Sequence, residues 1–200
     1  MVEKPAALAS LPALVGRVAV LGGTTGDKTA LLVGLALRQA RQRGLVVCLD
    51  ARRQRQTEVQ FRLLLRANAS YFALSPGEGV PDGIARTVLS TASRTLGAQS
   101  VPALLLLIDS VSADQEWERP LIFLLNAGVT VVELLPSAAD LIFGRYDTVL
   151  LLRTEGDAAS VVSRAVGRKV NATDLSNLRA GEGILIHLAR THWVTLPEVS

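Results

Sequence analysis

A glycine-rich turn followed by Lys28 and Thr29 is the stretch of this sequence best suited to chemistry. It comes directly after the apolar run Val18–Leu21. In a phosphate-binding loop, glycines let the backbone wrap round an anion, a lysine reaches the outer phosphates, and a threonine hydroxyl binds magnesium. The pattern therefore predicts a nucleotide site for ATP and Mg²⁺, formed by Gly22, Gly23, Thr24, Thr25, Gly26, Asp27, Lys28 and Thr29.

One residue of this loop departs from the pattern. Asp27 stands directly before the lysine, where the pattern has glycine. A polyphosphate repels a carboxylate there by about 4 kcal/mol for each pair of unit charges 4 Å apart at an effective dielectric constant near 20. Asp27 could instead cap a helix that we expect to begin at Lys28, or form an ion pair with Lys28. The ion pair would occupy the lysine, so the sequence leaves open whether the loop binds a nucleotide tightly.

A second candidate for the same site is Asp109, which closes the apolar run Ala103–Ile108. A buried strand with an aspartate at its tip can place a carboxylate beside the magnesium of a nucleotide. A strand that ends in aspartate is also common without any metal, but here a phosphate-loop pattern precedes it. We therefore expect Thr29 and Asp109 to bind the metal ion together. The residue after Asp109 is Ser110, where a water-orienting glutamate is usual.

Apolar runs and helical patterns alternate along the chain, which predicts an α/β fold. Continuous apolar runs are typical of strands buried on both faces of a parallel sheet. We expect one mostly parallel sheet with the active face at the strand C-termini. Its strands begin near Val18, Val46, Leu104, Val129 and Thr148, with a short strand at Tyr71–Leu74 and a closing hairpin that turns at Thr191-His192. The expected helices are Lys28–Arg43, Thr57–Arg66, Gly83–Leu96, Trp117–Ala127 and Gly156–Val166, with a short helix or turn at Asp140–Phe143.

The composition bounds the kind of protein. The chain has 200 residues, of which 49% are hydrophobic, enough for one domain with a sizeable core. We expect an N-terminal arm over residues 1–15 and a single domain over 16–200. Pro5 and Pro12 interrupt the arm, which is too short to span a membrane. The single cysteine, Cys48, excludes an internal disulfide and fits the cytoplasm, and no zinc-type ligand cluster is present.

Arginine is concentrated between residues 38 and 66, although the net charge of the whole chain is only +3. A solvated helix face explains such a pattern, and a surface that contacts nucleic-acid phosphates or another subunit is the alternative. DNA is therefore a candidate partner through Arg38, Arg41, Arg43, Arg52, Arg53 and Arg55, with Arg62 and Arg66 further along.

The order of these pieces resembles the RecA-like motor ATPases, and among them the HerA/FtsK group of DNA-pumping ATPases and conjugative coupling proteins. The loop is similar to that group's Gly-Ala-Thr-Gly-Ser-Gly-Lys-Ser. The other stretches that carry the resemblance are Asn126–Leu141, Arg145–Arg153, Asp157–Gly167 and Leu178–Ile186. The resemblance implies a three-layer RecA-like P-loop NTPase fold with helices on both faces of the sheet and a C-terminal β-hairpin. It also implies sites completed between subunits, by Arg145, Arg153 or Arg164.

The departures from that group lie at the positions that carry its catalytic chemistry. Asp27 replaces the loop glycine, Ser110 the catalytic glutamate, and Leu134 the sensing glutamine of the fourth strand. Asp50, at the tip of the second strand, is the candidate catalytic base in their place. Two hypotheses follow. The chain is either a degenerate nucleotide-binding scaffold or regulator that self-associates or serves DNA or a partner ATPase, or an active DNA-translocating ATPase.

Overall fold

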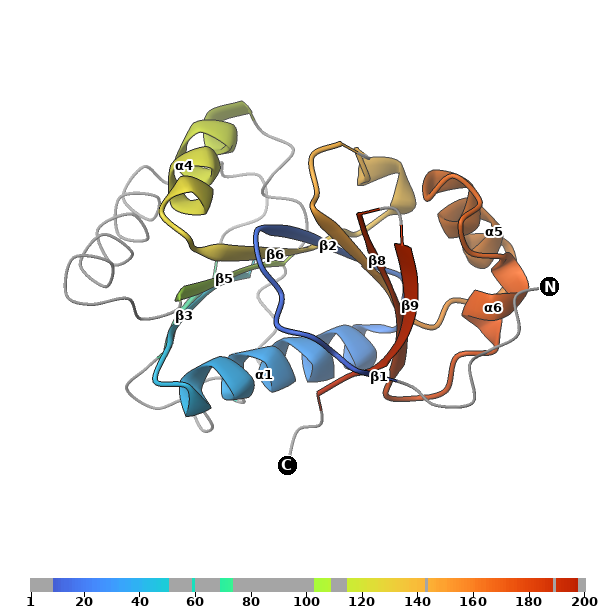
Figure 1. Cartoon of the computed structure of the whole chain (residues 1–200), viewed down its shortest axis with the longest axis horizontal. Helices are drawn as coiled ribbons and strands as arrows, with labels where there is room; N and C mark the ends of the chain where they lie inside the picture. The colour runs from blue at the N-terminus through green and yellow to red at the C-terminus, as the bar shows by residue number, and fades with distance from the viewer. Residues whose placement is uncertain are drawn as a thin grey trace.

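Nine strands form one sheet in the part of the chain that the computed structural model describes, residues 9–50, 59, 69–73, 103–108, 115–142, 144–188 and 190–197. Their order across the sheet is β1-β9-β8-β7-β2-β6-β5-β3-β4 (Figure 1). The strands are β1 Ala9–Ser10, β2 Arg17–Leu21, β3 Leu45–Asp50, β4 Ala69–Ala73, β5 Ala103–Ile108, β6 Thr130–Leu134, β7 Thr148–Leu151, β8 Glu182–His187 and β9 Arg190–Thr195.

The strands from β7 to β4 all run parallel, whereas β8 pairs antiparallel with both β7 and β9. The predicted strands near Val18, Val46, Leu104, Val129 and Thr148 are therefore confirmed, as is the short strand at β4. The sheet is mostly parallel and ends in an antiparallel hairpin, as expected.

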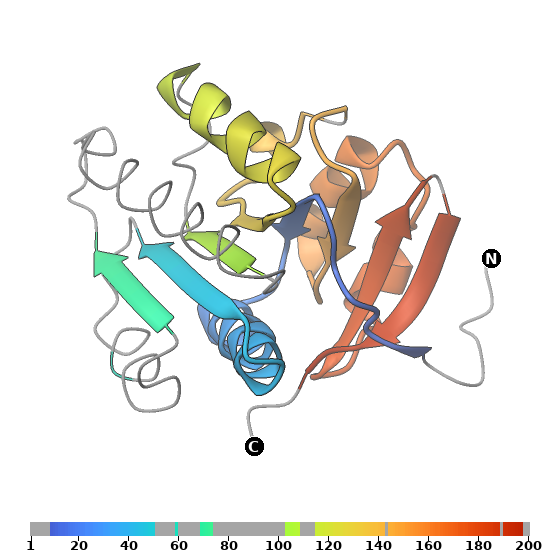
Figure 2. The ribbon, with the colours of Figure 1, turned by 60° about the vertical axis from the view of Figure 1, so that its left-hand side comes forward.

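Helices cover both faces of this sheet, so the molecule has three layers (Figures 1 and 2). Helix α1 packs on one face, and α4, α5 and α6 lie on the other. The helices are α1 Thr25–Arg41, α4 Gln115–Asn126, α5 Gly156–Ala165 and α6 Ala172–Ser176, with the short 3₁₀ turn η3 Ala138–Asp140. The expected helix at 83–96 lies outside the described residues, and of that at 57–66 only Val59 is described, in helical conformation.

Strand β2 shows why the core has two halves. All five of its residues are buried. Val18 and Val20 belong to the cluster beneath α1, whereas Ala19 and Leu21 belong to the cluster beneath α5 and α6. Successive side chains of a strand point to opposite faces, so a continuous apolar run fills both layers. The strand that precedes the glycine-rich loop is thus fixed in the middle of the molecule.

The hairpin turn differs from the prediction. His187 pairs with Arg190, so the turn lies between these residues, and Thr191 and His192 belong to β9. Leu188 has a φ of +45°, a left-handed conformation that usually selects Gly or Asn. The predicted turn at Thr191-His192 was wrong because the true turn carries no glycine or asparagine to mark it.

The arm that precedes β2 contributes to the sheet at its edge. Strand β1 pairs parallel with β9, and the Leu11 backbone N–H donates to the Thr195 carbonyl at 3.1 Å. Leu11 is itself buried in the cluster beneath α1. Among the helices that the structure describes, none combines the length and the apolar character that a membrane span needs.

Candidate functional site

The glycine-rich loop leaves the C-terminal end of β2, between β7 and β6. Gly22 and Gly23 have φ values of +78° and +74°, which favour glycine. A Cβ on Gly22 would lie 2.1 Å from the Thr154 hydroxyl oxygen, so a side chain there has no room. The Gly23 N–H donates to the Arg153 carbonyl at 2.8 Å. The loop is therefore held against the segment that follows β7.

Helix α1 begins at Thr25, with Thr24 as its N-cap, rather than at Lys28 as expected. The difference arises because Asp27 caps from inside the first turn. Its N–H donates to the Thr24 hydroxyl at 3.2 Å, while its carboxylate Oδ2 accepts from the Thr24 N–H and the Thr24 hydroxyl, both at 2.8 Å. This reciprocal capping box satisfies donors that the start of a helix otherwise leaves open.

Lys28 and Thr29 lie in the first turns of α1, and both are buried. The Lys28 ammonium donates to the carbonyl of Leu135 at 3.2 Å. Leu135 follows β6, the strand on the other side of β2 from β7, so the lysine reaches across the C-terminal edge of the sheet. This is the edge at which the sequence predicts the phosphates, and Lys28 would hold them there, with Thr29 as the ligand for magnesium.

Of the two acidic candidates, Asp50 lies further along the same edge of the sheet. Asp50 is the last residue of β3, fully buried, and pairs in register with Ile108. Ile108 is the last residue of β5 and pairs with Leu134. Asp109 and Ser110 lie outside the described residues, so the predicted Asp109 carboxylate has no measured distance to the loop. Asp50 is three strands from β2, roughly 14 Å at about 4.8 Å per strand.

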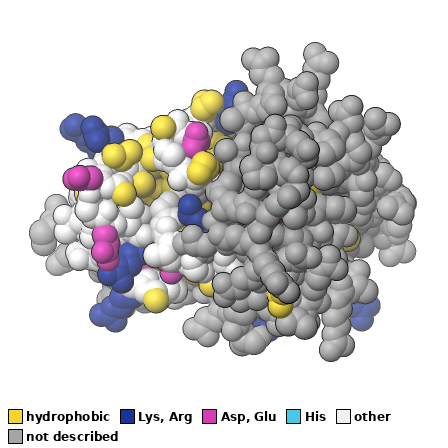
Figure 3. Space-filling model, turned by 180° about the vertical axis from the view of Figure 1, so that it is seen from behind, with side chains coloured by type: hydrophobic (Ala, Val, Ile, Leu, Met, Phe, Trp, Pro, Cys, Tyr) yellow, Lys and Arg dark blue, Asp and Glu magenta, His cyan; other side chains and the backbone are white. Residues whose placement is uncertain are grey.

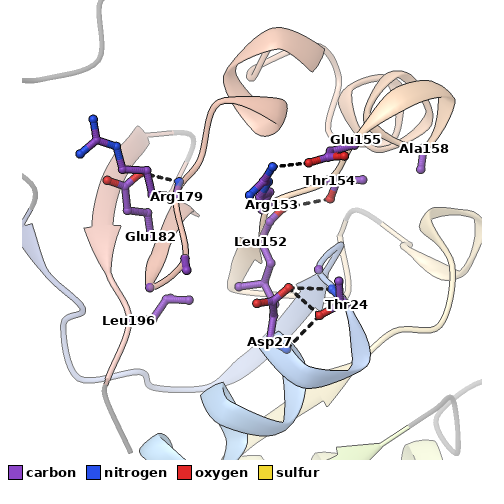
Figure 4. Close-up of a pocket in the computed structure, with 13 residues that line it drawn as sticks. Thr24, Asp27, Leu152, Arg153, Thr154, Glu155, Ala158, Arg179, Glu182 and Leu196 are labelled. Atoms are coloured by element: carbon purple, nitrogen blue, oxygen red, sulfur yellow. Dashed lines mark hydrogen bonds and ion pairs between the residues drawn. The ribbon is translucent and has the colours of Figure 1, made fainter.

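A pocket of about 540 Å³ opens beside the loop (Figure 4). That volume is typical of small-molecule sites. The β2–α1 loop, the segment after β7 and the segment that leads into β8 form its walls. Its lining residues are Gly23, Thr24, Asp27, Leu152, Arg153, Thr154, Glu155, Ala158, Arg179, Ala180, Gly181, Glu182 and Leu196.

Charged residues of both signs line this pocket. The Arg153 guanidinium forms an ion pair with Glu155, and the backbone N–H of Arg179 donates to the Glu182 carboxylate at 2.8 Å (Figure 4). Sequence reasoning did not place Glu155, Arg179 or Glu182 in a site. The similarity of the stretch around Glu182 to a closing strand was visible, but only the antiparallel pairing of β8 with β7 brings it beside the loop.

Of the three arginines expected to reach a neighbouring subunit, only Arg153 lies beside the chain's own loop. Arg145 precedes β7, at the opposite edge of the sheet, and pairs with Glu118 at 3.1 Å. Arg164 is exposed on α5, where its Nε donates to the Ser160 carbonyl at 3.3 Å. For Arg145, Arg153 and Arg164 alike, a contact with a neighbouring subunit stays a prediction.

Part of the arginine-rich stretch also falls within the described residues. Arg38 is engaged with the arm, because its guanidinium donates to the Leu11 carbonyl at 2.6 Å. Arg41 and Arg43 are exposed at the C-terminal end of α1. Arg52, Arg53 and Arg55 lie outside the described residues. The predicted DNA contact through these six arginines stays a prediction.

A buried ion-pair cluster lies at the other end of β2. The Arg17 Nε is 2.5 Å from a Glu133 carboxylate oxygen, and the two side chains are only 5% and 2% exposed. Glu118 lies 3.0 Å from Arg17, and the Tyr146 hydroxyl donates to Glu133 at 3.1 Å. Burial lowers the pKa of Arg17, but hydrogen bonds to both carboxylates and their charges outweigh it and raise the pKa overall.

The back of the molecule carries another kind of surface. Hydrophobic side chains gather on the described part of this face, between scattered charged groups (Figure 3). Among the described residues, Ile142, which follows η3, and Val161, on α5, are exposed large apolar side chains.

Solved structures similar to this chain include two genome-packaging enzymes and VirB4. The DNA-packaging ATPase B204 from Sulfolobus Turreted Icosahedral Virus is similar to this chain with a TM-score of 0.66, over 90% of this chain and 97% of its own, at 11% sequence identity. The genome-packaging NTPase B204 from Sulfolobus turreted icosahedral virus 2, in complex with ATP-gammaS, gives a TM-score of 0.61 at 9% identity, over 91% of this chain and 98% of its own.

The chain has the RecA-like fold. VirB4 of Thermoanaerobacter pseudethanolicus shows the same likeness, with a TM-score of 0.60 at 9% identity over 92% of this chain and 89% of its own. The expected RecA-like architecture is thereby confirmed, with the glycine-rich loop on the central strand. No protein-family model and no curated protein matches this chain.

Proposed function

We propose that this chain is a nucleotide-binding RecA-like domain that hydrolyses ATP slowly or not at all, and that it acts in the cytoplasm as a scaffold or regulator for DNA or for a partner ATPase. The observation that carries the proposal is the Asp27 carboxylate, which is bonded inside the loop where a phosphate-binding loop has glycine. The loop has kept its lysine and threonine but has gained an internal anion.

Retained binding is supported by the surroundings of the loop. The Lys28 ammonium lies at the C-terminal edge of the sheet. The adjoining pocket of about 540 Å³ is large enough for a nucleotide base and sugar. Among the similar structures, NTPase B204 of Sulfolobus turreted icosahedral virus 2 is in complex with AMP or with ATP-gammaS. These features support ATP with Mg²⁺ as the ligand.

Slow hydrolysis is supported by Leu134 and Ser110, the residues at the two positions expected to orient the attacking water. Leu134 is fully buried in the core, and its aliphatic side chain cannot bind a water or a phosphate. Ser110 cannot act as a general base in the way that a glutamate does. The loss of a positioned general base lowers a rate by about 10²- to 10⁴-fold. ATP that binds would therefore persist.

Equilibrium titration with a fluorescent ATP analogue, with and without Mg²⁺, tests the proposal. We expect saturable, magnesium-strengthened binding in the wild type and its loss in Lys28→Ala, with ATP turnover well below 1 per second. Equal signals from the wild type and Lys28→Ala would show that the loop binds no nucleotide. The folded state of both proteins is checked by circular dichroism.

An active DNA-translocating ATPase is the second candidate. The observation in its favour is the likeness to a DNA-packaging ATPase over 97% of that enzyme's chain. Turnover of ATP on the order of 1 to 10³ per second, the range ordinary for enzymes, would establish it over the first proposal. Asp50 would then be the residue to test as the base, through Asp50→Asn.

A further inference from the structure

The glycine-rich loop already holds an anion, the carboxylate of its own Asp27. We propose that Asp27 is a tethered anion that a nucleotide phosphate must displace, and that Arg153 is the residue of the same chain that binds this phosphate. This inference rests on the proposed nucleotide-binding function and adds both a regulation of the site and a binding residue to it.

Four donors in and beside the loop have partners within the protein itself. The Thr24 N–H and the Thr24 hydroxyl both donate to Asp27 Oδ2. The Gly23 N–H donates to the Arg153 carbonyl, and the Lys28 ammonium donates to the Leu135 carbonyl. A phosphate group needs donors of these kinds. A phosphate therefore competes with the Asp27 carboxylate for the N–H and the hydroxyl of Thr24.

The competition has a magnitude. At 4 Å and an effective dielectric constant near 20, a carboxylate and one phosphate charge repel enough to weaken binding on the order of a thousandfold. Asp27 is only half-buried beside an open pocket, so solvent reduces this effect. We expect the carboxylate to weaken phosphate binding by about ten- to a hundredfold.

Arg153 is placed to offset that repulsion. Its side chain lines the pocket together with Thr24 and Asp27 (Figure 4), and its carbonyl is bonded to the loop at Gly23. Its partner Glu155 is the N-cap residue of α5 but makes no side-chain capping bond there. The two side chains are 51% and 65% exposed, and exposed pairs of this kind contribute little stability.

The Arg153 guanidinium can therefore leave Glu155 at little cost. A guanidinium binds either a carboxylate or a phosphate through two parallel hydrogen bonds, because both groups present paired oxygens. Arg153 can therefore exchange the Glu155 carboxylate for a phosphate. When a nucleotide binds, Asp27 leaves the Thr24 donors and Arg153 turns from Glu155 to the phosphate. Without nucleotide the loop is closed by its own residues.

A pair of matched substitutions tests the role of Asp27. Asp27→Asn removes the charge at the loop, whereas Asp140→Asn removes the charge from the same kind of capping box, formed by Ser137 and Asp140 away from the pocket. In titrations with Mg-ATP we expect Asp27→Asn to tighten binding ten- to a hundredfold and Asp140→Asn to leave it unchanged. Thermal melts of both variants report any loss of helix capping.

A double-mutant cycle tests Arg153. We expect Arg153→Ala to weaken Mg-ATP binding by about tenfold or more in the wild type and by less in Asp27→Asn, because the charge it offsets is then gone. The exposed Arg190, on β9, supplies the control Arg190→Ala, which should have no effect. Equal losses from Arg153→Ala in both backgrounds would refute the compensation.

The outcomes also separate this inference from the proposed function. If the wild type binds Mg-ATP and Asp27→Asn binds it with the same affinity, the tethered-anion proposal is refuted, whereas the proposed nucleotide binding is supported. Absence of binding in the wild type, in Asp27→Asn and in Asp27→Gly alike, with all three folded, refutes both the proposed function and the inference.

Discussion

The buried pair of Arg17 and Glu133 gives a sharp prediction about stability. Both side chains are almost fully buried, with a 2.5 Å contact between Arg17 Nε and the carboxylate. Arg17→Met keeps most of the side-chain volume but removes the charge. Among the described residues, Glu133 would then keep the Tyr146 hydroxyl as its partner, and Glu118 would keep Arg145. The substitution thus leaves one buried carboxylate without a counter-charge.

The size of the effect follows from that geometry. Removal of one partner from a buried ion pair costs about 3–5 kcal/mol. At about 2–4 °C per kcal/mol for a chain of this length, the melting temperature should fall by about 6–20 °C. The exposed end of the cluster, at Glu118, adds little to this because solvent screens it.

Urea denaturation measures the effect, with Arg17→Met/Glu133→Leu as the matched double variant. The double variant should recover most of the loss, because two apolar groups of similar volume can replace a buried ion pair at nearly no cost. A loss below about 1 kcal/mol in Arg17→Met would refute the reasoning, as would a double variant less stable than the single. Salt should have little effect on the difference, because a buried pair is poorly screened.

The pKa of Arg17 also fixes the pH range of this stabilisation. A folded-state pKa raised above the ordinary arginine value gives stability that is present below that ordinary value and lost only as the pH rises through the raised one. Both values lie in the strongly alkaline range, so the Arg17 contribution to the free energy of unfolding should stay constant between pH 6 and pH 9.

Three further predictions concern function. Ser110→Glu should add ATP hydrolysis only where ATP is bound, so at a low ATP concentration turnover in the double variant with Asp27→Gly should exceed the sum of the single variants; equal turnover in Ser110→Glu with and without Asp27→Gly would show that Asp27 is no obstacle. If the chain self-associates, its light-scattering mass should rise with concentration, and a monomer at every concentration would count against a ring. If DNA contacts the end of α1, then Arg41→Gln and Arg43→Gln should each lower the salt dependence of binding by about one phosphate contact; an unchanged slope would place the contact elsewhere.

The sequence predicts most of this fold because its strongest signals are local. The apolar runs at β2, β3, β5 and β7 mark strands buried on both faces, and Gly22 with Lys28 marks the turn between a strand and a helix. The start of α1 was misplaced because the loop pattern counts residues from its glycines, whereas the helix begins where Thr24 and Asp27 can bond each other. That bond depends on conformation and not on spacing alone.

The pocket could not be predicted in the same way. Thr154 and Glu182 are far apart in the sequence, and both line the pocket only because β8 turns antiparallel onto β7. The Arg17–Glu133 pair was missed for a related reason. Each residue lies among apolar neighbours, and only the pairing of β2 with β6 brings them onto one face of the sheet.

The short strand β1 has a consequence for the handling of this protein. Within the described residues, it covers the outer edge of β9 through Ala9 and Ser10, while Leu11 donates to the Thr195 carbonyl and lies in the core beside them. A variant that lacks the residues before 16 would expose the backbone donors and acceptors on the outer edge of β9. An uncovered strand edge invites pairing with another chain. Such a protein should precipitate or form strand-linked dimers, so any oligomer measured on it would reflect the truncation.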